Sequence, residues 1–263
     1  MRYDLKGKVV LITGASSGLG EALAHELARE GAKLALVSRS LAKLEHVAAA
    51  CKTHGAAEAR AYALDVTRAA DAGRVVERVQ HDLGALDVLI NNAGVHALAT
   101  VADMPEGLFR EALEVNLFGP LRLIQAALPA LRRSQGMVVN IGSSLAFRAI
   151  PTGGAYAASK GALARLTEAL RDEETRHHVH VLHACPGVVI TQLRENALKH
   201  GVQVDAQDKL PYPRSAQQTA KEIVQAMRAR RRELVSAAWP VRLWAKVLVP
   251  WMGASVDKRM RLS

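Results

Sequence analysis

Two side chains four residues apart, Tyr156 and Lys160, are spaced for acid-base chemistry. The pattern from about 155 to 176 predicts a helix, and residues at i and i+4 lie on the same face of a helix. A tyrosine hydroxyl has an ordinary pKa of about 10, which is too high for an efficient base at neutral pH. A neighbouring ammonium group favours the phenolate. The pair therefore predicts a side chain that donates and accepts a proton.

A glycine-rich segment lies between an apolar run at 8–13 and a helical pattern that begins near Leu19. Glycines at such a turn let the backbone approach a pyrophosphate, whose charge is stabilised by the N-terminus of the helix that follows. The spacing is G-x-x-x-G-x-G rather than G-x-G-x-x-G, and a tight strand-to-helix turn without a ligand is the alternative. The segment reads Thr13-Gly14-Ala15-Ser16-Ser17-Gly18-Leu19-Gly20.

The residues after the second apolar run indicate which dinucleotide would bind. An acidic residue at this place binds the 2′-hydroxyl of the adenosine ribose, whereas a basic residue accommodates a 2′-phosphate. Here Ser38 replaces the acid, and Arg39 offers a planar fork of donors to a phosphate. The sequence predicts NADP(H), and a solvated turn at Arg39 is the alternative.

Short apolar runs alternate with longer helical patterns along the chain. This alternation predicts βαβ units, and hence a parallel sheet covered by helices on both faces. We expect one doubly wound, Rossmann-like α/β domain at 1–235 and a C-terminal appendage of the same domain at 236–263. The expected strands lie at 8–13, 34–37, 60–64, 86–90, 137–141 and 179–184, and the expected helices at 19–29, 41–53, 69–82, 106–133 and 155–176.

These motifs together resemble the short-chain dehydrogenase/reductase family. The resemblance covers roughly 5–235, and the features occur in the order and at the spacing of that family. Besides the glycine-rich segment they are Asn91-Asn92-Ala93-Gly94, Asn116, Ser143, Tyr156-x-x-x-Lys160 beginning 13 residues after Ser143, and Pro186-Gly187.

The resemblance implies a role for each of four catalytic residues. Tyr156 would donate a proton to a carbonyl oxygen, or remove one from an alcohol. Lys160 would lower the pKa of the tyrosine and bind the nicotinamide ribose. Ser143 would hydrogen-bond the substrate oxygen, where charge develops, with the adjacent Ser144 as the alternative donor. Asn116 would hold a water that links Lys160 to solvent.

It also implies the residues that contact the cofactor. Asp65-Val66 match the position that contacts adenine, and Asn92-Ala93-Gly94 match the residues along the adenosine ribose, whereas Asn91 would tie two strands together. Pro186, Val189 and Thr191 match the segment at the nicotinamide carboxamide and the phosphates. The full expected set is Gly14, Ser16, Ser17, Gly18, Leu19, Gly20, Ser38, Arg39, Asp65, Val66, Asn92, Ala93, Gly94, Tyr156, Lys160, Pro186, Gly187, Val189 and Thr191.

The expected activity is an NADP(H)-dependent interconversion of a carbonyl and an alcohol by hydride transfer. The alternative is a regulatory protein that binds NADP without chemistry, although such a protein need not retain Ser143, Tyr156 and Lys160 together. The helices expected at 106–133 and 155–176 resemble the subunit interface of the family, which implies a homodimer or a homotetramer.

The composition of the chain argues against several other classes of protein. The chain has 263 residues, 49% hydrophobic and 23% charged, which argues against a disordered or fibrous protein. Two cysteines, Cys51 and Cys185, are too few for a disulfide scaffold, so a reducing cytoplasm is expected. Four histidines at 177–183 have no acid or thiol at ligand spacing, and we expect no metal site.

The net charge of +10 is concentrated at the C-terminus. Nine basic and two acidic residues lie at 228–263, so that segment carries seven of the ten excess charges, which weakens a nucleic-acid hypothesis. Trp239, Trp244 and Trp251 lie there too. One interpretation is a pocket lid or subunit contact, and the other is a peripheral membrane contact through 239–262. Both favour an apolar substrate.

Overall fold

A seven-stranded, wholly parallel sheet forms the centre of this computed structural model, which describes residues 2–193, 195–202 and 213–236. Its strand order is β11-β7-β6-β4-β1-β2-β3. The strands are β1 (Val9–Thr13), β2 (Lys33–Ser38), β3 (Glu58–Ala63), β4 (Val88–Asn91), β6 (Met137–Ile141), β7 (His180–Pro186) and β11 (Glu233–Ser236).

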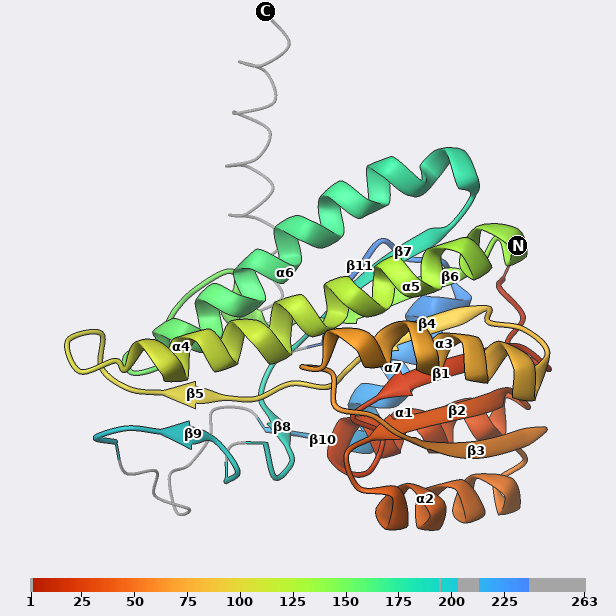
Figure 1. Ribbon diagram of the computed structural model, residues 1–263, viewed down its shortest axis with the longest axis horizontal. Coiled ribbons are helices and arrows are strands. Elements are labelled where there is room, and N and C mark those ends of the chain that lie inside the picture. The colour runs from red at the N-terminus through yellow and green to blue at the C-terminus, as the bar shows by residue number, and fades with distance from the viewer. Residues whose placement is uncertain (1, 194, 203–212, 237–263) are drawn as a thin grey trace, which may run out of the picture.

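Helices cover both faces of the sheet (Figure 1). Helices α1, α2 and α7 pack on one face, and α3, α5 and α6 pack on the other. The helices are α1 (Gly18–Arg29), α2 (Leu41–Thr53), α3 (Ala69–Leu83), α4 (Glu106–Leu113), α5 (Gly119–Ser134), α6 (Gly154–Glu173) and α7 (Ala216–Arg228). The doubly wound fold is therefore confirmed.

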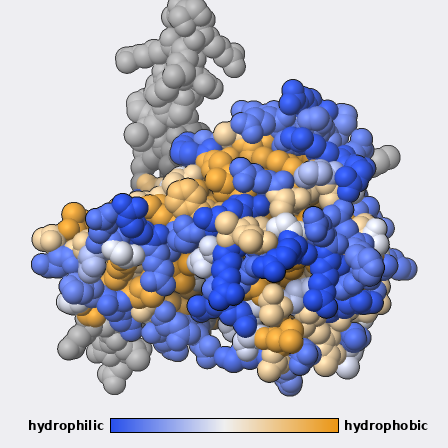
Figure 2. Space-filling view, in the orientation of Figure 1, coloured by the Kyte–Doolittle hydropathy of each residue, from blue (hydrophilic) through white to orange (hydrophobic). Residues whose placement is uncertain are grey.

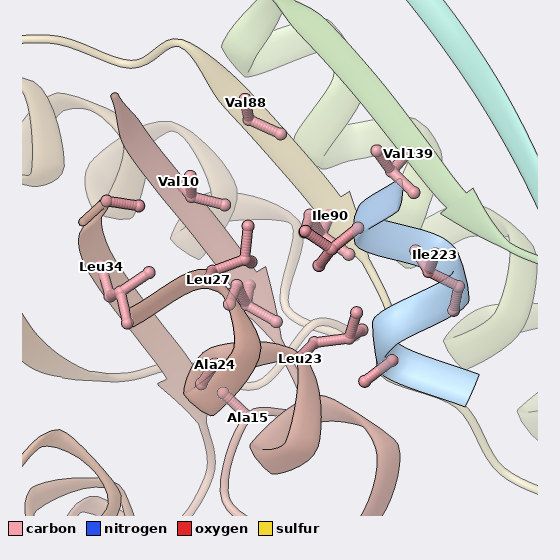
Figure 3. Packing of buried hydrophobic residues seen from close by; sticks show 14 of the residues in the cluster. Val10, Ala15, Leu23, Ala24, Leu27, Leu34, Val88, Ile90, Val139 and Ile223 are labelled. Atoms are coloured by element: carbon pink, nitrogen blue, oxygen red, sulfur yellow. The ribbon is translucent and has the colours of Figure 1, made fainter. Parts of the chain in front are cut away.

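The strands read as continuous apolar runs because each strand is buried on both faces. Successive side chains of a strand point to opposite faces. Val10 and Ile12 of β1 pack in the cluster under α1 and α7, whereas Val9 and Leu11 pack in the cluster under α3 and α5. Figure 3 shows the first of these clusters, in which Ile223 of α7 lies among side chains of the sheet.

The order of the strands determines where a ligand can bind. From β1 the chain winds outward through β2 and β3, and it then returns to the other side of β1 through β4. This reversal leaves a crevice at the carboxyl ends of β1 and β4, which is where ligands bind in open α/β sheets. The glycine-rich segment follows β1, and Asn92-Ala93-Gly94 follow β4, so both reach this crevice.

One expected helix is interrupted. Instead of a continuous helix at 106–133, the structure has α4, a π-helical turn at Glu114–Phe118 and then α5. Pro120 has no N–H, so it cannot donate the α-helical hydrogen bond to the carbonyl of Asn116. The periodicity of apolar residues does not reveal such a wide turn. Asn116 lies at the centre of this turn.

Most other expected elements occur, with ends shifted by a few residues. The helix expected at 155–176 is α6 followed by a 3₁₀ turn at Glu174–His177. Sequence reasoning did not identify α7, β11 or two small parallel sheets. These sheets pair β5 (Ala97–Leu98) with β9 (Leu198–Lys199) and β8 (Val189–Ile190) with β10 (Arg214–Ser215).

No helix in the described ranges is both long and apolar enough to cross a membrane. The segment at 237–263, with its three tryptophans, lies outside the described residues.

Candidate active site

A cleft of about 1920 Å³ opens at the carboxyl ends of the central strands. The cofactor residues expected from the sequence come from six separate segments, and every one of them lines this cleft. Ser143, Tyr156 and Lys160 line it too, whereas Asn116 is fully buried behind it. The fold therefore brings the candidate catalytic and cofactor residues into one site.

The glycine-rich segment has the shape that a pyrophosphate requires. Gly14 and Gly18 have φ values of +65° and +59°, which favour glycine. A Cβ on Gly20 would lie 2.2 Å from the carbonyl oxygen of Gly14. Ser17 is the N-cap of α1, and its side chain makes no capping hydrogen bond, so the first amides of the helix face the cleft uncapped. Such a helix N-terminus fits an anionic phosphate group.

Hydrogen bonds join the end of β1 to the end of β4. The hydroxyl of Thr13 accepts hydrogen bonds from the backbone N–H groups of Asn92 and Ala93, at 3.0 and 2.9 Å. The side-chain amide of Asn92 donates to the carbonyl oxygens of Thr13 and Gly14. Asn91 does tie two strands together, because its Nδ2 donates to Oδ1 of Asn140 at 2.8 Å on the neighbouring β6. These bonds hold the floor of the cleft in place.

Basic and hydroxyl groups gather where β2 ends. Arg39 is exposed and lines the cleft beside Ser38, and Lys43 from the first turn of α2 lines it as well. The pKa of Asp65 is lowered, chiefly by hydrogen bonds from Thr67 and to a smaller extent by the charge of Arg39. This corner of the cleft is suited to an anion.

Sequence reasoning missed Lys43. A basic residue in the first turn of a helix is unusual, because the helix dipole favours acidic residues there. This unusual position of Lys43 is the signal that could have identified it. The first turn of α2 has no acidic residue.

Tyr156 is buried, and burial raises the pKa of its hydroxyl to about 12. A hydrogen bond with the side chain of Ser143 acts in the opposite direction but is outweighed. This bond involves Ser143 rather than Ser144. Burial is the largest cause of the raised pKa, and the role of Lys160 in lowering the pKa of the tyrosine stays a prediction. At neutral pH the hydroxyl is therefore protonated.

Lys160 is 4% exposed, and burial lowers its pKa to about 8. Its ammonium donates a hydrogen bond to the carbonyl oxygen of Ile141 at 2.9 Å and lies 5.9 Å from the centroid of the Tyr156 ring. With a pKa of about 8, most of the lysine still carries its charge at neutral pH. A buried cation beside a phenol can hold sugar hydroxyls and support proton transfer.

Asn116 lies in the π-helical turn, with its side chain bonded on three sides. Its Oδ1 accepts from the N–H of Val95, and its Nδ2 donates to the carbonyl oxygen of Val95 and to the hydroxyl of Ser159. A Cβ on Gly94 would lie 3.1 Å from Oδ1 of Asn116 and 3.6 Å from Nζ of Lys160. Because Gly94 has no side chain, space remains between these two groups. The backbone carbonyl of Asn116 lacks its α-helical donor, because Pro120 has no N–H.

The histidines between 177 and 183 do not converge. His183 is buried on β7 against the thiol of Cys185, which is also buried, whereas His178 is exposed. In the described part of the chain, no group of three or more His, Cys, Asp or Glu side chains is placed to hold a metal ion.

Comparison with known families agrees with this geometry. A family model described as "short chain dehydrogenase" matches residues 8–201. The chain belongs to the short-chain dehydrogenase/reductase family. As a member of this family, it is an oxidoreductase that acts between hydroxyl and carbonyl groups with a nicotinamide cofactor.

Individual members of the short-chain dehydrogenase/reductase family match most of the chain. An 11-beta-hydroxysteroid dehydrogenase A from Sesamum indicum is 32% identical over 99% of this chain and 77% of its own length. The 11-beta-hydroxysteroid dehydrogenase 1A of Arabidopsis thaliana is 36% identical over 94% of this chain and 73% of its own length.

Solved structures of this family share the fold. An alcohol dehydrogenase from Thermococcus sibiricus, complexed with 5-hydroxy-NADP, superposes with a TM-score of 0.79 at 29% identity, and covers 89% of this chain and 97% of its own. A family member from Burkholderia phymatum in complex with NAD superposes with a TM-score of 0.82 over 98% of this chain and 96% of its own. At 23% identity the second likeness concerns the fold alone.

Proposed function

We propose that this protein is an NADP(H)-dependent reductase or dehydrogenase that interconverts an apolar carbonyl compound and its alcohol. The observation that carries the proposal is the convergence of Tyr156, Ser143 and Lys160 in the cleft that also contains the glycine-rich segment. The glycine-rich segment would hold the phosphates of the cofactor, and Tyr156 lines the same cleft.

The chain's own residues divide the chemistry among them. The nicotinamide, when bound, supplies or accepts the hydride. Tyr156 gives its proton to the carbonyl oxygen during reduction, which suits a hydroxyl that is protonated at neutral pH. Ser143 donates a hydrogen bond to the same oxygen as charge develops on it. Lys160 holds the nicotinamide ribose, and a water between Asn116 and Lys160 resupplies the proton.

Three features support NADP(H) over NAD(H). No acid follows β2, Arg39 lines the cleft, and Lys43 adds a second cation from the start of α2. A carboxylate at this place would repel a 2′-phosphate, whereas a guanidinium binds one through two donors. The thermococcal alcohol dehydrogenase, solved with an NADP derivative, is a related precedent.

The walls of the cleft support an apolar substrate. Beyond the catalytic residues they carry aliphatic side chains from several elements, and the two plant relatives are named for hydroxysteroids. Water leaves such a surface when an apolar ring or chain covers it, which favours binding. These side chains include Val95, Leu98, Leu145, Ile150, Leu193 and Leu198.

A substrate panel tests this function. Benzaldehyde, cyclohexanone, a 3-keto steroid and retinaldehyde are each mixed with the protein and NADPH or NADH, and loss of reduced cofactor is followed by absorbance. We expect turnover with NADPH on at least one of the bulkier compounds. Tight NADPH binding without turnover on any compound, in either direction, would favour the regulatory alternative instead.

Assembly and location remain predictions. Helices α5 and α6 pack on the same face of the sheet (Figure 1), and Phe118, in the π-helical turn before α5, is 41% exposed. Figure 2 shows hydrophobic residues among hydrophilic ones on the surface seen from this side. A homodimer or homotetramer through these helices is proposed, and sedimentation at several protein concentrations tests it. A cytoplasmic location and a membrane contact through 239–262 are also proposed, and the latter lies outside the described residues.

A further inference from the structure

The imidazole ring of His96 lies against the phenol ring of Tyr156. The two ring centroids are 4.3 Å apart and the ring planes differ by 17°, which is a stacked arrangement. His96 lines the cleft two residues after Gly94, and Tyr156 is 6% exposed. The histidine therefore covers one face of the ring that carries the proposed proton donor.

Two further groups lie close to Tyr156, one from the loop after β6 and one from the same helix, α6. Ser143 bonds the hydroxyl, and the ammonium of Lys160 lies 5.9 Å from the ring centroid. The hydroxyl is at the far end of the side chain, so a change in χ1 moves it more than any other atom of the ring. A flat ring packed on the face of the phenol opposes that movement.

The backbone that carries His96 is itself held on both sides. Asn116 bonds both the N–H and the carbonyl of the preceding Val95, each at 2.9 Å. The carbonyl oxygen of His96 accepts the N–H of Leu198 at 2.8 Å. The imidazole is thus attached to a segment that has little freedom to shift.

The helix that carries Tyr156 is bonded to the same asparagine. Nδ2 of Asn116 donates to the hydroxyl of Ser159 at 3.0 Å, and that hydroxyl donates to the carbonyl oxygen of Tyr156 at 2.8 Å. One buried side chain therefore sets the distance between the segment of His96 and the helix of Tyr156.

We propose that His96 is a positioning residue for Tyr156, holding the phenol so that its hydroxyl reaches both Ser143 and the substrate oxygen. The proposal rests on the proposed function, because the position of that hydroxyl affects the rate only if Tyr156 donates the proton. Small displacements of a reacting group lower the rate strongly, since the bound geometry must be close to that of reaction. A stacked aromatic ring supplies such a restraint without taking part in the chemistry.

The test compares His96→Ala with His96→Phe in the full chain, using NADPH and the carbonyl compound of the panel that is reduced fastest. His96→Ala should lower kcat roughly 2- to 12-fold, which is the interaction free energy of an aromatic pair converted into a ratio of rates. The Kd for NADPH should stay the same. His96→Phe keeps a flat ring and should restore most of kcat. His46→Ala removes an exposed histidine outside the cleft and should change nothing.

A double variant separates this proposal from the proposed function. If His96 acts through the phenol hydroxyl, adding His96→Ala to Tyr156→Phe should cause no further loss of kcat. Independent, multiplying losses would overturn the proposal, and so would a failure of His96→Phe to restore kcat. Normal kcat in His96→Ala, with activity lost in Tyr156→Phe, would overturn the role of His96 alone. Normal turnover in Tyr156→Phe would overturn both.

Discussion

At the residue scale, the hydroxyl of Tyr156 should account for most of the chemistry. Tyr156→Phe removes the proton donor and leaves the ring, so the stack with His96 can persist. Turnover should fall by roughly 10²- to 10⁴-fold, the usual worth of positioned acid-base catalysis. Steady-state kinetics measure the loss, and fluorescence titration should show nearly unchanged NADPH affinity. Near-normal turnover would remove Tyr156 from the mechanism.

A second prediction at this scale concerns Arg39 and Lys43, which lie where a 2′-phosphate would bind. Arg39→Ala should weaken NADPH binding roughly 10- to 150-fold, the range for hydrogen bonds to charged groups. Lys43→Ala should have a smaller effect, because an exposed ammonium is a solvated point charge.

NADH binding should barely change in either variant, because it carries no 2′-phosphate. Titrating both cofactors into both variants is the measurement. Equal losses for NADPH and NADH would show that Arg39 supports the fold and does not recognise the phosphate.

At the scale of elements, Gly20 sets how closely α1 can approach the end of β1. A Cβ at position 20 would lie 2.2 Å from the carbonyl of Gly14, so Gly20→Ala must push the helix and the loop apart. We expect loss of NADPH binding, measured by titration, and a lower melting temperature.

Gly73 is the matched control for this substitution. It lies inside α3, and a Cβ there would meet nothing within 4 Å. Gly73→Ala should stabilise the protein by roughly 0.5–1 kcal/mol, because alanine is the better helix former. Equal behaviour of the two variants would contradict the close approach at Gly20.

At the scale of the whole molecule, His183 links stability to pH. Burial, together with the charge of Lys160, lowers the pKa of His183 from 6.5 to about 4. Between pH 6.5 and pH 4 the imidazole of His183 is protonated in the unfolded chain and neutral in the folded chain. The free energy of unfolding should therefore decrease as the pH falls from 6.5 toward 4, by about 3 kcal/mol from this group alone.

Urea unfolding of the natural chain and of His183→Gln at a series of pH values measures this contribution. Carboxylates titrate in the same range in both proteins, so the difference between the two curves isolates the histidine. The variant should lose less stability on acidification. Parallel curves for His183→Gln would show that the buried ring is not the acid-sensitive group.

The layered fold and most residues of the cleft could be predicted from the amino-acid sequence. Alternating apolar runs and helical periods are local properties, and a parallel sheet is what such alternation can build. The glycine-rich segment, Asn92-Ala93-Gly94 and Tyr156-x-x-x-Lys160 carry their spacing in the chain, so their place at the ends of strands followed directly.

How these groups affect one another depends on the folded arrangement of the chain. The pKa of Tyr156 depends chiefly on its burial in the folded chain, which the Tyr156-x-x-x-Lys160 motif does not reveal. Lys43 and His96 reach the cleft through folding, although neither belongs to a motif. The stack of His96 on Tyr156 depends on a contact between residues distant in sequence, and local periodicity carries no record of such a contact.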